Sequence, residues 1–202
     1  MATRFPWDYH SDLTAERLTI VAQLIADGRQ VAVELFDWEA GDNGWTLGCR
    51  AFQFARARIL RAADSGKFPW LDVIDRTLQL ILKIVEVPVR IYRGDADEPT
   101  DRTVRQTLNE LKQLSLLFDE RDEGRALAYR FAIETDIDGG VLAVKFVGLR
   151  GKTAVLNWDV PLDLAGAAGG TVGRAATESI ELTAPVVGVR GMGDKDRDSD
   201  AG

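Results

Sequence analysis

The period of the apolar residues changes along this chain, and that change constrains its fold more than any other feature of the sequence. In the first 118 residues, apolar side chains recur mostly at helical spacing, whereas Leu127, Tyr129, Phe131 and Ile133 alternate as in a strand. Helices followed by strands indicate an α+β fold rather than the repeating units of an α/β fold. We expect about four helices packed on a small antiparallel sheet or meander, followed by a flexible C-terminal tail.

Four helices are expected from apolar periodicity and from residues that favour helix ends. Their ranges are about 14–38, 45–64, 69–82 and 100–118. The first helix contains Gly28 and could instead end there, with 31–35 continuing as a strand. The apolar positions keep their phase across the glycine, which favours one continuous helix. In the second helix, the small residues Gly48, Ala51 and Ala55 predict a closely packed neighbour.

The expected strands are recognised by alternation and by their turn residues. Residues 87–91 alternate around Pro88, which excludes a helix interior at this point. Further strands are expected at 127–133, 141–149 and 154–160. Asp138 and Gly139 form a typical hairpin turn between the first two of these, so we expect an antiparallel meander.

A change in composition after Pro161 marks the end of the expected domain. The segment 166–202 holds eight of the nineteen glycines and no aromatic residue, and it ends in a charged run. Such a segment cannot offset its ordering entropy by burial. The sequence therefore predicts an N-terminal arm at 1–12, one domain at 13–164 and a disordered tail at 165–202. Whether 180–189 forms a strand stays open.

The net charge and the residue counts exclude several classes of function. A net charge of −7 disfavours nonspecific nucleic-acid binding, which depends on neutralising phosphates. One cysteine, Cys49, and one histidine, His10, cannot form an intrachain disulfide or a Cys/His zinc site. No apolar run is long enough to span a membrane, and no signal-peptide core begins the sequence. We expect a cytoplasmic protein without a cofactor or metal, and the Ala/Arg/Asp-rich composition suggests a bacterial source.

A group of acids near the expected hairpin is the first candidate for chemistry. Glu134, Asp136 and Asp138 occupy alternate positions, so their carboxylates are expected on one strand face, with Lys145 on the next strand. Converging acids can bind a divalent cation or carry out acid–base chemistry. The comparison with metal nucleases built on Asp, Glu and Lys fails on spacing, because no acid stands two residues before Lys145. A carboxylate hydrolase or nuclease is therefore an alternative to an ordinary polar hairpin end.

Arginines on the second helix and on the 87–91 strand form the second candidate site. Their members are Arg50, Arg58, Arg61, Arg90 and Arg93. The first three lie within about 80° on one helix face and could clamp a carboxylate or phosphate, as in a small-anion sensor. A solvated face that pairs with the many acids of the chain is the ordinary explanation for them, and it is favoured over an anion site.

The third candidate is a pair of tryptophans, and it supports the function that we expect. Trp38 and Trp45 flank a glycine-rich turn, where burial is hard to arrange, although both could pack beneath it. Tryptophan is enriched at the energetic centres of protein interfaces. Because no catalytic pattern is specific, we expect a noncatalytic interaction module that binds another protein, from a bacterial regulatory, defence or toxin–antitoxin system. A homo-oligomer stays an open alternative.

Overall fold

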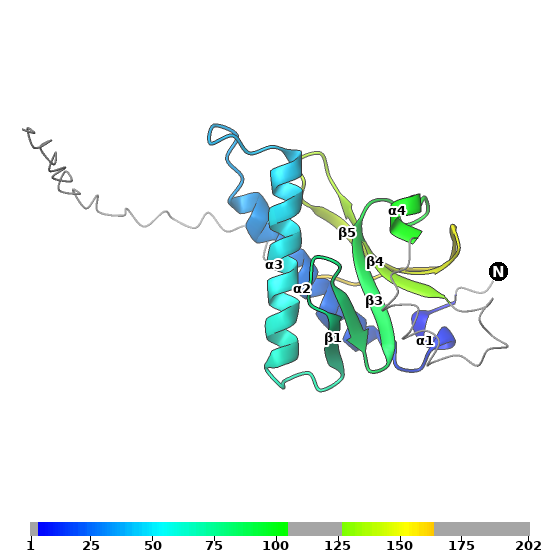
Figure 1. Cartoon of the computed structure of the whole chain (residues 1–202). Helices are drawn as coiled ribbons and strands as arrows, with labels where there is room; N and C mark the ends of the chain where they lie inside the picture. The colour runs from blue at the N-terminus through cyan, green and yellow to red at the C-terminus, as the bar shows by residue number, and fades with distance from the viewer. Residues whose placement is uncertain (1–3, 105–126, 164–202) are drawn as a thin grey trace, which may run out of the picture. The chain divides into compact units, whose positions relative to one another are not determined.

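The computed structural model describes residues 4–104 and 127–163, which form helices and one sheet (Figure 1). The helices are α1 (Pro6–Tyr9), α2 (Ala15–Glu34), α3 (Gly44–Asp64) and α4 (Asp101–Val104). The strands are β1 (Leu71–Asp75), β2 (Ile81–Ile84), β3 (Val87–Arg93), β4 (Ala128–Thr135), β5 (Val141–Arg150) and β6 (Thr153–Asp159). The broad α+β class is confirmed. The expected arrangement of about four helices on a small sheet is wrong. The described part of the chain has two long helices, two single helical turns and six paired strands.

The six strands lie in the sheet in the same order as in the chain. Neighbouring strands are antiparallel except β3 and β4, which are parallel, with Ile91 opposite Phe131. Parallel neighbours end at the same edge of a sheet, so Arg93 at the end of β3 lies opposite Ile133 of β4. The β4–β5 turn therefore begins close to Arg93.

α2 begins at a capped residue and buries one side of its surface. Thr14 Oγ1 accepts a hydrogen bond from the backbone N–H of Arg17 at 3.4 Å, which satisfies one free donor of the first turn. Its fully buried side chains recur at helical spacing and include Leu18, Val21 and Ile25. The helix continues through Gly28, as the sequence predicts, but ends at Glu34 rather than near Trp38.

α2 and α3 approach each other closely at Gly28. A Cβ atom on Gly28 would lie only 2.5 Å from the backbone nitrogen of Ala55. Glycine inside a helix costs about 0.5–1 kcal/mol relative to alanine, and here the neighbouring helix requires it. Gly48, a further position where close packing is expected, has no described atom within 4 Å of its would-be Cβ. The expectation is therefore right for Ala55 and wrong for Gly48.

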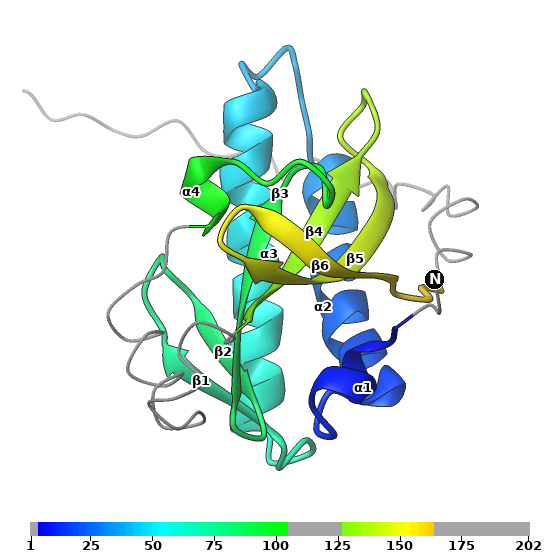
Figure 2. The same cartoon turned by 90° about the vertical axis from the view of Figure 1, so that its right-hand side faces the viewer.

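The main core lies between the two long helices and one face of the sheet. Phe131 and Phe146 are fully buried in it, with their ring centroids 5.1 Å apart. A smaller cluster on the other face contains Ala96, Ala128, Ala132, Val147 and Leu149. Figure 2 shows α2 and α3 behind the sheet, whereas α4 lies in front of them.

The helix expected at 69–82 is wrong, because β1 and β2 occupy this range. The turn between them is held by Asp75 Oδ1, which accepts hydrogen bonds from the backbone N–H of Thr77 at 2.8 Å and from its hydroxyl at 2.6 Å. Leu78, within the range expected to be helical, is 72% exposed in this turn. The strand expected at 87–91 is confirmed as β3.

The N-terminal arm forms α1, which packs against β6. The Trp7 ring meets the Trp158 ring edge-on, with the centroids 5.4 Å apart. The Tyr9 hydroxyl donates a hydrogen bond to the Val155 carbonyl oxygen at 3.1 Å. These contacts tie the arm to the last described strand of the sheet.

The meander expected at 127–160 is confirmed, because β4, β5 and β6 pair in sequence and antiparallel. The helix expected at 100–118 begins as α4, and the rest of its range lies outside the described residues, as does the tail expected at 165–202. In the described part of the chain, no helix has the length and apolar character needed to cross a membrane.

Candidate functional site

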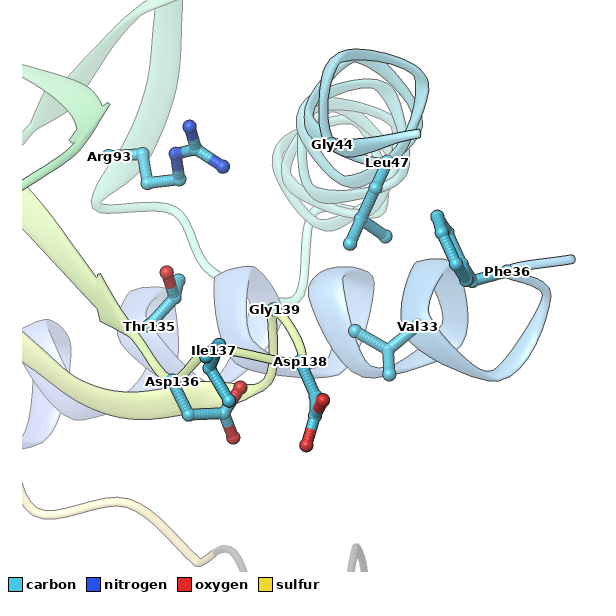
Figure 3. A pocket seen from close by; sticks show the side chains of 10 residues that line it. All are labelled: Val33, Phe36, Gly44, Leu47, Arg93, Thr135, Asp136, Ile137, Asp138 and Gly139. Atoms are coloured by element: carbon cyan, nitrogen blue, oxygen red, sulfur yellow. The ribbon is translucent and has the colours of Figure 1, made fainter. Parts of the chain in front are cut away.

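A cleft of about 440 Å³ opens where α2 ends, α3 begins and the β4–β5 turn meets the end of β3 (Figure 3). Its lining residues are Val33, Phe36, Gly44, Leu47, Arg93, Thr135, Asp136, Ile137, Asp138 and Gly139. Apolar side chains come mainly from the helices, and polar ones come from the strands and the turn. The volume lies within the range of ligand-binding pockets.

The β4–β5 turn is fixed by its own hydrogen bonds and by close packing. Asp136 Oδ1 accepts a hydrogen bond from the Gly140 backbone N–H at 2.7 Å. Gly139 has a φ of +87°, a left-handed conformation that glycine adopts without steric cost. A Cβ atom on Gly139 would lie 2.6 Å from Leu47 Cδ2, so the turn is pressed against α3.

Arg29 of α2 holds this turn from within the protein. Its side chain is 3% exposed, and its Nε donates a 2.6 Å hydrogen bond to the Gly139 carbonyl oxygen. Its Nη2 is buried without a hydrogen-bond partner among the described residues. Burial lowers the pKa of this guanidinium, the charge of Arg93 acts in the same direction, and Asp136 opposes both.

Sequence reasoning missed Arg29, although a signal for it exists. The residue stands four positions after Ile25, on the buried stripe of α2. A charged side chain is rarely buried unless it is paired, so an arginine in phase with a buried apolar stripe marks a position with a special role.

Arg93 is the exposed positive charge of the cleft. It forms no hydrogen bond or ion pair with the described residues. Figure 3 shows its guanidinium extending from β3 toward the side of the cleft where Leu47 lies, while the carboxylates of Asp136 and Asp138 point away from it. The acids of the turn therefore do not neutralise Arg93.

The loop between α2 and α3 is held in one conformation by a bidentate ion pair. Arg50 Nη1 and Nη2 donate to the two carboxylate oxygens of Asp42 at 3.0 and 2.9 Å, and Nη1 also donates to the Leu35 carbonyl oxygen at 2.7 Å. The Asp37 backbone N–H donates to Asp42 Oδ2 at 3.0 Å. These bonds connect both ends of the loop to α3.

This fixed loop carries Trp38, and Trp45 follows in the first turn of α3. Trp38 is 74% exposed and Trp45 is 76% exposed, so neither packs beneath the turn. Val33 at the end of α2 and Phe36 in the same loop are half-buried and line the cleft, and Ile137 of the opposite turn is fully exposed. Large apolar side chains thus stand both inside the cleft and on the elements that border it.

The three candidate acids do not share one strand face in the structure. β4 ends at Thr135, so Asp136 and Asp138 lie in the turn rather than on the strand face expected for them. Glu134 lies 3.1 Å from Lys145 Nζ and accepts a hydrogen bond from the Ala96 backbone N–H at 3.3 Å. Within 4–104 and 127–163, no three Cys, His, Asp or Glu side chains gather as metal ligands would.

The five candidate arginines have different surroundings. Arg50 is engaged by Asp42, and Arg90 donates to Gln79 Oε1 at 3.3 Å. Arg58 and Arg61 form no ion pair with the described residues, and they do not line the cleft. Of the five, Arg93 alone lines the cleft.

Comparison of the chain with protein-family models, with curated proteins and with solved structures finds no match. The functional argument therefore rests on the site itself.

Proposed function

We propose that this chain is a noncatalytic binding module that holds a segment of another protein in the cleft, with Trp38 and Trp45 contacting that partner. The observation that carries the proposal is the exposure of both indoles on the loop and the helix start that supply Phe36 and Gly44 to the cleft. Asp42 and Arg50 fix this loop. Large exposed apolar groups that gather at one place mark interaction sites more often than chance.

The fixed loop makes these two indoles suited to binding. A segment whose backbone is already ordered loses less conformational entropy on association, so more of the burial of its side chains appears as affinity. Tryptophan adds a large apolar area with few rotatable bonds, which is why it dominates many interface energies. The cleft beside the loop offers space for an apolar side chain of the partner against Val33, Phe36 and Leu47.

The positions of the acids do not favour the hydrolase alternative. Glu134 is paired with Lys145, and Asp136 is used to close its own turn. The cytoplasmic location and the membership of a bacterial regulatory, defence or toxin–antitoxin system stay predictions.

The test measures the partner affinity of matched tryptophan and leucine variants. A photo-reactive amino acid at Ile137 would capture the partner in host cells, and the purified partner would then be titrated by calorimetry. Trp38→Ala and Trp45→Ala should each weaken binding by about 30-fold, or about 2 kcal/mol, without lowering stability. Leu78→Ala is the control, because Leu78 is equally exposed but lies on the β1–β2 turn, outside the cleft.

Two results would contradict this function. Equal losses for Leu78→Ala and for the tryptophan variants would show that the effect is not specific to the cleft. Dimers of the chain that both tryptophan substitutions abolish would show that the occupant is a second copy rather than another protein.

A further inference from the structure

Behind the wall of the cleft lies a buried arginine, Arg29, one of whose hydrogen-bond donors has no partner among the described residues. The Arg29 side chain is only 3% exposed, and its Nη2 has no hydrogen-bond partner among the described residues. Buried arginines are normally paired with a carboxylate, because an uncompensated charge in the interior is costly. Asp136 is close enough to act on Arg29 electrostatically, but no hydrogen bond joins the two side chains.

The unpartnered Nη2 lies directly behind the cleft surface. A Cβ atom on Gly139 would be 3.4 Å from Arg29 Nη2 and 2.6 Å from Leu47 Cδ2. Gly139 and Leu47 both line the cleft, so the guanidinium adjoins the space between them. Because residue 139 is glycine, no side chain stands between this nitrogen and Leu47.

A second guanidinium approaches the same space from the strand side. Arg93 has no ion pair or hydrogen bond with the described residues, and its charge is near enough to Arg29 to disfavour that group's protonated form. Thr135, whose side chain also lines the cleft, adds a hydroxyl (Figure 3). Neither guanidinium forms an ion pair with a carboxylate of the described residues, so the two like charges repel each other, and a bound carboxylate would reverse this unfavourable arrangement.

We infer that the cleft contains a carboxylate site, in which Arg93 binds the ligand directly and the buried guanidinium of Arg29, behind Gly139, adds a second positive charge. The inference rests on the proposed function for its biological ligand: the partner segment carries an acidic residue or a C-terminal carboxylate next to its apolar anchor. The planar guanidinium of Arg93 can bind both oxygens of such a group. The apolar wall of Val33, Phe36 and Leu47 receives the neighbouring side chain.

The first experiment uses acetate alone and the full chain labelled with ¹⁵N. Sodium acetate replaces sodium chloride at constant ionic strength, and the Nε–Hε signals of the arginines are followed. Signals of Arg93 and Arg29 should shift saturably, with those of Thr135 and Gly139, whereas Arg61 on the exposed face of α3 should not respond. The same shifts in all arginines, or shifts with phosphate and none with acetate, would overturn the carboxylate assignment.

The second experiment uses apolar acetylated tripeptides, each made as a free C-terminal acid and as an amide. The acid form should bind the wild-type chain about tenfold more tightly than the amide. Arg93→Gln should remove this difference, and Arg61→Gln should keep it, because Arg61 carries the same charge on α3 but does not line the cleft. Equal affinity of acid and amide for the wild-type chain would overturn the inference.

The inference and the proposed function can fail separately. A partner that depends on Trp38 and Trp45 but binds Arg93→Gln as well as the wild type would overturn the carboxylate site and leave the binding function intact. Acetate binding at Arg93, together with tryptophan variants that bind the partner normally, would support the carboxylate site and reject the proposed function.

Discussion

The Nε of Arg29 donates a 2.6 Å hydrogen bond to the carbonyl oxygen of Gly139, across 110 residues of sequence. This bond connects the middle of α2 to the turn between β4 and β5. It places a wall of the cleft relative to the helices before any ligand is present. Changes at the turn should therefore alter stability and the shape of the cleft together.

Gly139→Ala should destabilise the protein more than an equivalent change elsewhere. Gly41 is the matched control, since its φ of +95° is similar to the +87° of Gly139, but nothing lies within 4 Å of its would-be Cβ. Gly41→Ala should cost about 1–2 kcal/mol from left-handed strain alone. Gly139→Ala should cost about 1 kcal/mol more, because the new methyl group must displace Leu47. If urea denaturation shows the same loss of unfolding free energy for both variants, Leu47 can move away from the new methyl group at no cost.

Two helical glycines should respond to alanine in opposite directions. Gly48→Ala should raise the free energy of unfolding by about 0.5–1 kcal/mol, because it stiffens α3 and meets no neighbour. Gly28→Ala should lower it by about 1–3 kcal/mol, because the methyl group would meet the backbone of Ala55 at 2.5 Å. Thermal and urea denaturation of the full chain measure both changes. A stabilising Gly28→Ala would mean that the two helices can separate at little cost.

Much of the helical part of the fold could be predicted, because burial in a helix follows a period that few strands imitate. The exception is 69–82, where Trp70, Ile74 and Leu78 happen to stand four residues apart. The turns before and after β2 lack the usual signals: Leu80 has a φ of +33° and Val85 a φ of +55°, positive values that glycine or asparagine normally supplies. The parallel pairing of β3 and β4 could not be predicted, because alternation is the same for either strand direction.

The candidate site could be predicted only in part, because the local pattern of residues does not reveal which strands pair and in which direction. The exposure of Trp38 and Trp45 follows from their place beside a turn, which is a local property. The cleft itself depends on the parallel pairing that brings Arg93 beside the β4–β5 turn. The role of Arg29 cannot be predicted from the sequence, because its hydrogen-bond acceptor, the Gly139 carbonyl oxygen, lies in a turn 110 residues away.

Glu134→Gln should destabilise the chain in a pH-dependent way. Lys145 Nζ lies 3.1 Å from Glu134 Oε1, and this contact raises the pKa of the lysine. A pKa raised by folding gives stability that is fully present below the ordinary value of 10.5 and is lost as the pH rises through the folded value. The substitution should cost about 1 kcal/mol near neutral pH, and the difference should shrink in alkaline solution. Denaturation at several pH values measures it, and a difference that stays constant would contradict this view of the pair.

The order of the α2–α3 loop should depend on the ionisation of Asp42. The backbone N–H of Asp37 donates to this carboxylate, and Arg50 binds both of its oxygens. These donors hold the pKa of Asp42 below its ordinary value of 3.8, although desolvation acts in the opposite direction. A pKa lowered by folding gives stability that is present above 3.8 and is lost as the pH falls through the folded value.

Asp42→Asn should therefore loosen the loop at neutral pH, and the wild-type loop should approach the same state as acid is added. Hydrogen exchange of the Ala40 amide and the fluorescence anisotropy of the indoles report this order, since Trp38 lies within the loop. Asp138→Asn is the control, because it removes an exposed acid from the turn opposite and should leave the loop unchanged. If Asp42→Asn matches the wild type at neutral pH in both measurements, the ion pair does not order the loop. The preorganisation of Trp38, on which the proposed binding function relies, would then need another cause.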